Sequence, residues 1–150
     1  MNLLGLDLSK TAIGWASVRG EALDSGVQRL KMRRGDSPGM LYIRFEAWLR
    51  ELISLTSPTV IAYEQPHHRG GYATEIAFGL TTRLQSVCAE KKIEHTQINS
   101  RTLKKFFTGS GLCNKEAMVH RAEELTGRKM ETDDEADAIA VVLNLKEQLS

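Results

Sequence analysis

The chain has 150 residues, 41% of them hydrophobic, which is enough for one compact domain that buries roughly two thirds of its unfolded surface. Its 20 basic and 19 acidic side chains exclude a strongly basic surface, so any nucleic-acid binding must depend on a local basic patch. Cys88 and Cys113 belong to no CxxC motif or Cys/His cluster, which argues against a disulfide framework or a zinc site. No segment has the length of a membrane span or the apolar core of a signal peptide, so we expect a soluble, cytoplasmic protein.

The N-terminal part of the chain predicts a meander of three strands. Residues 2–8 are a short apolar run that ends in an acid. Residues 12–19 and 22–31 are strand-like stretches, and Arg19-Gly20-Glu21 between them suits a hairpin turn.

A helix and a buried strand are predicted next. Between Pro38 and Pro58, apolar residues recur at three- and four-residue spacing, which is typical of an amphipathic helix. Residues 59–63 are rich in β-formers and place Glu64 at the C-terminal end of a buried strand.

The second half of the chain is mainly helical. We expect helices over residues 73–90 and 101–107, a strand over 94–98 and a polar loop over 108–113. Asn114 and Gly127 suit the two ends of a further helix, and Thr132 with Glu135 fits the capping box of the last one. Strands and helices that alternate within one domain, residues 1–150, indicate the α/β class.

Two acids stand at the ends of predicted strands. Asp7 ends the first strand and Glu64 ends a later one, and open α/β sheets bind their ligands beyond the carboxyl ends of strands. Either acid alone would also suit an ordinary turn. Two such placements favour a shared site.

Two further acids, Asp134 and Asp137, lie three residues apart on one face of the last helix. Favourable interaction with the helix dipole and solubility explain Asp133 and Glu135 in the first turn. Asp137, however, lies in an apolar run whose alanines would let the helix approach a sheet closely. A carboxylate on that face needs a partner.

Divalent cations would explain the convergence of the four acids Asp7, Glu64, Asp134 and Asp137. At about 4 Å, two carboxylates repel by roughly 4 kcal/mol at an effective dielectric constant of about 20. Oxygen ligands without cysteine favour Mg²⁺ or Mn²⁺, and a pair of such ions can hydrolyse a phosphodiester.

The order of these motifs resembles the RuvC-type resolvase family over nearly the full length of the chain. The resemblance rests on Gly5-Leu6-Asp7, Glu64-Gln65, Asp134-x-x-Asp137-Ala138, Arg101-Thr102-Leu103-Lys104, and a glycine-containing loop that leads to Lys115. It implies an RNase H-like fold with a central mixed sheet of about five strands flanked by helices. It also implies a homodimer, with residues 73–90 as its surface, that makes paired nicks in a four-way DNA junction with two Mg²⁺ ions per site, for which Mn²⁺ can substitute.

The resemblance further implies that Lys104 and Lys115 support catalysis and phosphate contact. We also expect Arg101, Lys105, His67, His68, Arg69 and Tyr72 to contact DNA, with His67 or Tyr72 stacking on a base. The segment after Glu64-Gln65 departs from the family, in which an apolar stretch with an aromatic residue wedges against junction bases. We therefore expect a compact relative, bacterial or phage-borne, whose junction opening can differ.

Three alternative functions stay open at this point. Asp7-Leu8-Ser9-Lys10-Thr11 superficially fits the phosphate hairpin of actin-like ATPases and sugar kinases, but these enzymes need two such domains around a nucleotide cleft. A catalytically inert branched-DNA-binding protein with the same fold would not need all four acids. A nuclease for RNA, flaps or forks would use the same carboxylates, because they report phosphodiester chemistry and not branch geometry.

Overall fold

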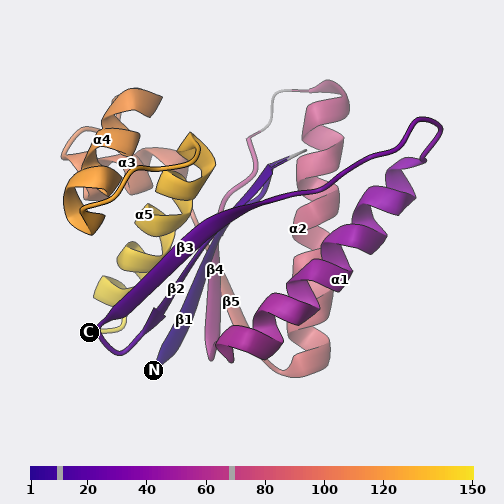
Figure 1. The fold of residues 1–150 in the computed structure, drawn as a ribbon, viewed down its shortest axis with the longest axis horizontal. Helices are drawn as coiled ribbons and strands as arrows, with labels where there is room; N and C mark the ends of the chain where they lie inside the picture. Colours follow the sequence, from indigo (N-terminus) through magenta and orange to yellow (C-terminus); the bar gives the residue numbers. More distant parts are fainter. Residues whose placement is uncertain (10–11, 68–69) are drawn as a thin grey trace.

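A computed structural model describes residues 1–9, 12–67 and 70–150 (Figure 1). The predicted meander is confirmed and consists of β1 (Asn2–Asp7), β2 (Ala12–Arg19) and β3 (Ala22–Arg29). A two-residue turn joins β2 to β3, and Gly20 in it has a φ of +62°, which glycine adopts at little cost.

The alternation of helices and strands after the meander is also confirmed. α1 (Pro38–Thr56) begins at the predicted proline. The remaining elements, in chain order, are β4 (Val60–Glu64), α2 (Gly71–Lys91), β5 (Glu94–Ile98), α3 (Ser100–Thr108), α4 (Lys115–Thr126) and α5 (Asp133–Gln148).

The predicted helix caps position the last two helices. The Asn114 side chain accepts a hydrogen bond from the N–H of Ala117 at 2.9 Å, and Gly127 ends α4 with a φ of +72°. Thr132 caps α5 by accepting from the N–H of Glu135 at 3.4 Å. These side chains satisfy backbone groups that have no partner within the helices.

Within the described residues, five strands form one mixed sheet in the order β3-β2-β1-β4-β5. β1 is antiparallel to β2 and parallel to β4, and β4 is parallel to β5. Leu6 pairs with Tyr63, so Asp7 and Glu64 end neighbouring strands at the same edge of the sheet. The α/β class and the five-stranded mixed sheet are therefore as predicted.

Helices cover both faces of the sheet (Figure 1). Leu4 and Leu6 of β1 belong to the core beneath α1 and α2, whereas Leu3 belongs to the core beneath α3, α4 and α5. A Cβ atom on Gly5 would lie only 2.7 Å from the nitrogen of Val142, so α5 rests directly on β1. This contact confirms the close approach expected from the alanines of α5. No helix in the described part of the chain combines the length and apolar character needed to cross a membrane.

Candidate active site

Four acidic side chains meet where β1 and β4 end and α5 begins. Carboxylate oxygens of Asp7, Glu64 and Asp137 lie within 4.8 Å of one another. Asp134, one turn before Asp137 on α5, shares a side-chain hydrogen bond with Asp7. The structure therefore brings together all four acids that were predicted from the sequence to share a site.

Gly14 of β2 allows α5 to come this close. It is the cross-strand partner of Asp7, and a Cβ atom at this position would overlap the main-chain carbonyl of Asp134. Because the obstacle is helix backbone, a side chain at position 14 could be accommodated only by displacing the first turn of α5. The glycine thus places Asp134 beside Asp7.

Burial and mutual repulsion raise the pKa values of three of the acids. Burial raises the pKa of Asp7 well above its usual range, and Asp137, Glu64 and Asp134 raise it further. Burial, followed by the charges of Glu64, Asp133 and Asp134, raises the pKa of Asp137 to about 8. The pKa of Asp134 is also raised, mainly by burial. Positive charge brought into this cluster would therefore lower these pKa values and favour the ionised carboxylates.

Lys104 and Lys115 line the same cleft as the acids. The Lys115 Nζ atom lies 3.7 Å from an oxygen of Asp133, and the charge of Lys104 slightly offsets the rise in the pKa of Asp137. The ion pairs of the described residues include none from lysine or arginine to Asp7, Asp134 or Asp137. The cleft has a volume of about 400 Å³. Polar residues that also line it are Ser9, Gln65, His67, Thr74, Thr81 and Ser100.

The chemistry of this donor set suits hard divalent cations. Every candidate ligand is a carboxylate oxygen, and the oxygens of Asp7, Glu64 and Asp137 are close enough to bind one ion together. A cation there would also remove the repulsion among the acids. The residues therefore fit a metal centre.

The predicted DNA-contacting residues are spread around the cleft. His67 lies at its rim, with Nε2 3.7 Å from a Glu64 oxygen, and also lines a neighbouring hollow together with Arg101 and Lys104. Lys105 and Tyr72 are exposed and are not among the described residues that line the cleft. His68 and Arg69 lie outside the described residues. DNA contact by this group stays a prediction.

Asp133 and Glu135 both lie in the first turn of α5 as predicted, but solubility was the wrong explanation for the buried Glu135, and the explanation of Asp133 was incomplete. Glu135 is only 2% exposed and is hydrogen-bonded to Ser25 and Arg128, whereas Asp133 lines the cleft and pairs with Lys115. Of the capping box, only the Thr132 half is present as predicted, because the Glu135 carboxylate accepts from the N–H of Glu131. Successive residues of a helix point about 100° apart, and this spacing could have assigned the two acids to different neighbours.

No model of a protein family matches the chain. The crossover junction endodeoxyribonucleases RuvC of Rickettsia conorii and Rickettsia rickettsii are each 27% identical to it over 149 residues, 94% of both chains. The RuvC structure from Thermus thermophilus superposes with a TM-score of 0.80, covering 99% of this chain and 96% of that one at 19% identity. The chain is a relative of RuvC. A T. thermophilus RuvC structure in complex with a Holliday junction substrate also matches, with a TM-score of 0.80 and 19% identity over 95% of this chain and 91% of that one. The RuvC likeness confirms the predicted RNase H-like fold.

Proposed function

We propose that this chain is a metal-dependent crossover junction endodeoxyribonuclease that resolves four-way DNA junctions by paired nicks. The observation that carries the proposal is the cluster of four acids at the carboxyl edge of the sheet, with two lysines in the same cleft. The similarity to RuvC, which spans nearly the whole of both chains, supports the substrate. It also disfavours an ATP phosphoryl-transfer domain, which would need a second such domain.

Asp7, Glu64, Asp134 and Asp137 would hold the metal ions, with Mg²⁺ as the expected ion, two per site, and Mn²⁺ as a substitute. When bound, such ions activate a water molecule for attack on the phosphodiester and stabilise the leaving oxygen. The protein's own part is to collect the carboxylates on rigid strand and helix ends, where positive charge would lower the raised pKa values of Asp7, Asp134 and Asp137.

The two lysines would act on the phosphate. Lys115 lines the cleft, and its exposed ammonium group lies 3.7 Å from an oxygen of Asp133. From there it can stabilise the charge that develops on the scissile phosphate. Lys104 lies at the border between the cleft and the hollow lined by His67 and Arg101, and can orient the DNA backbone there.

Paired nicks require two active sites, which a homodimer would supply. α1 and α2 cover one face of the sheet and carry large apolar side chains at their surface, among them Ile43, 60% exposed, and Phe78, 41% exposed. Aromatic side chains such as that of Phe78 are enriched at subunit interfaces. We assign the dimer contact to this face. A Phe78→Glu variant should elute as a monomer, and an unchanged dimer would move the interface elsewhere.

The test of the proposed function is cleavage of a labelled four-way junction, a fork, a duplex and a single strand in the presence of Mg²⁺, Mn²⁺, Ca²⁺ or EDTA. We expect Mg²⁺- or Mn²⁺-dependent nicking of the junction at paired positions, and loss of nicking but not of binding in Asp7→Asn and Glu64→Gln. Full activity in EDTA would contradict the metal mechanism. Binding without cleavage under every metal condition would instead support an inert branched-DNA-binding protein.

A further inference from the structure

A buried carboxylate lies directly beside the acid cluster but turns away from it. Glu135 follows Asp134 on the first turn of α5 and is only 2% exposed. One of its oxygens accepts hydrogen bonds from the Ser25 hydroxyl at 2.7 Å and from Arg128 at 2.9 Å. The other accepts from the N–H of Glu131 at 2.9 Å. Both oxygens are thus paired, as a buried charge requires.

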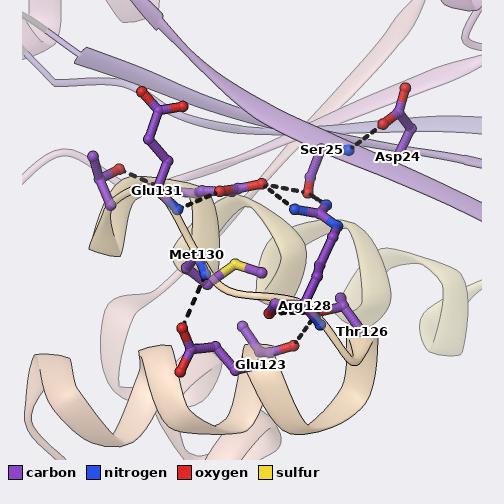
Figure 2. A network of polar contacts seen from close by, with 10 residues as sticks. Asp24, Ser25, Glu123, Thr126, Arg128, Met130 and Glu131 are labelled. Atoms are coloured by element: carbon purple, nitrogen blue, oxygen red, sulfur yellow. Dashed lines mark hydrogen bonds and ion pairs between the residues drawn. The ribbon is translucent and has the colours of Figure 1, made fainter.

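Arg128 closes this group of contacts into a ring. Its guanidinium bonds Glu135 through one nitrogen and the Ser25 hydroxyl through another, and Figure 2 shows Arg128 and Ser25 reaching toward each other. Ser25 belongs to β3, Arg128 to the segment between α4 and α5, and Glu135 to α5. The fork geometry of arginine allows one side chain to bridge two partners. β3 is therefore joined at one point to the start of α5 and to the segment just before it, more than 100 residues away in the sequence.

This ring of hydrogen bonds helps to set how the first turn of α5 is rotated about the helix axis. Because successive helical residues point about 100° apart, holding Glu135 against β3 sets the rotation of Asp134 toward Asp7. Gly14, against which the carbonyl of Asp134 rests, prevents the turn from sinking further into the sheet. Contact with Gly14 alone does not prevent the turn from rotating or lifting away. The hydrogen bond from Ser25 of β3 to Glu135 opposes both movements.

We propose that Ser25, Arg128 and Glu135, here called the α5 clamp, are positioning residues that hold Asp134 and Asp137 in the geometry needed to bind divalent cations. The inference rests on the proposed metal-dependent function. The clamp residues do not enter the cleft, so they act through the rotation of α5 and not by touching metal or DNA. Groups that hydrogen-bond directly to metal ligands typically contribute a factor of about 10–100 to metal affinity, and we expect the clamp, which acts through the helix, to contribute at the lower end of this range.

The test is Mn²⁺ binding by calorimetry to the full chain without DNA, which does not depend on activity. We expect Glu135→Gln and Arg128→Ala each to weaken Mn²⁺ binding about tenfold. Arg128 is partly exposed, so its truncation leaves the core intact if the Glu135 variant folds poorly. Arg128→Lys keeps the charge but lacks the planar fork whose two nitrogens reach Glu135 and Ser25 separately, and should fall in between. The double variant should be no weaker than the weaker single one, because both changes break one unit.

Two controls separate the α5 clamp from general stability and from the metal site itself. Arg50→Ala removes the ion pair with Glu90, which joins α1 to α2 away from the cleft, and should leave Mn²⁺ affinity within about twofold of the parent. Asp7→Asn should abolish binding. Parent-like affinity in folded Glu135→Gln and Arg128→Ala, or effects that multiply in the double variant, would overturn the clamp and leave the metal site standing. Parent-like binding in Asp7→Asn would overturn both proposals.

Discussion

Glu135 and Asp137 stand two residues apart on α5 and meet opposite electrostatic environments. Burial alone would raise the pKa of Glu135, but hydrogen bonds from the N–H of Glu131, from Arg128 and from Ser25 outweigh it, and the pKa is lowered. Burial and three neighbouring acids raise the pKa of Asp137 to about 8.

The difference shows which of the two carboxylates has its charge compensated by groups of the protein itself. Arginine, hydroxyl and amide donors surround the Glu135 carboxylate, so it needs nothing from outside the chain. Asp137 is surrounded mainly by other acids, and added positive charge would favour its ionised form. Burial does not distinguish a structural acid from a metal ligand. The charge and donors of its neighbours do.

The largest expected effect contrasts the two acids in catalysis. Asp137→Asn should slow junction nicking by roughly 10³-fold at saturating Mg²⁺, because a metal centre supplies several kcal/mol of transition-state stabilisation. Glu135→Gln should slow it by no more than about tenfold, since excess metal compensates for weaker binding. Single-turnover nicking rates measure both. Equal losses of nicking rate in the two variants would contradict the distinction between Asp137 and Glu135.

The second effect concerns Lys115, which lines the cleft with its ammonium group 3.7 Å from an oxygen of Asp133. Lys115→Ala should reduce the single-turnover rate by roughly 10–100-fold while junction affinity changes little, because the ammonium group acts on developing charge. Lys146→Ala is the matched control, since Lys146 is in the last turn of the same helix as the acids. An unchanged rate in Lys115→Ala would remove this lysine from the site.

The third effect is the dependence of stability on pH in the absence of metal. A carboxyl with a raised folded-state pKa binds more protons folded than unfolded, so stability falls as pH rises from about 4 toward about 8. We expect Asp137→Asn to raise the melting temperature at pH 8 by roughly 5 °C and to have little effect at pH 4.

Glu135 should behave in the opposite manner in the same melts. Its pKa is lowered, so its contribution to stability is fully present above the unfolded pKa and is lost only as pH falls through the folded value. Glu135→Gln should therefore destabilise the protein by the same amount from pH 6 to pH 8. A loss of stability that changes between pH 6 and pH 8 would show that Glu135 titrates together with the acids of the cleft.

The smallest effect is expected at the rim. His67→Ala should weaken junction binding about fivefold if the ring stacks on a base, since one such contact contributes about 1 kcal/mol or more. His120, exposed on α4, provides the control substitution. Unaltered binding in His67→Ala would assign the ring to solvent.

The sequence could predict the elements and the four acids because their signals are local. Periodic apolar residues, Pro38, Asn114 and Thr132 define the helices, and strand ends deliver Asp7 and Glu64.

The α5 clamp escaped prediction because Ser25 and Glu135 are 110 residues apart, beyond any helical periodicity. The favourable position of an acid near a helix N-terminus also explained Glu135 without its burial. Nor could Gly14 be linked to Asp134 until β2 and α5 were seen in contact.

The central claim is that Asp7, Glu64 and Asp137 bind metal whereas Glu135 is structural. Its most direct test is a crystal structure of the full chain, from crystals grown with Mn²⁺ and data collected at a wavelength where manganese scatters anomalously. Anomalous peaks are expected between the carboxylates of Asp7, Glu64 and Asp137, with none at Glu135, whose bonds to Ser25 and Arg128 should persist. Peaks absent from the acid cluster at saturating Mn²⁺, or a peak in place of the Arg128 contact at Glu135, would contradict the account.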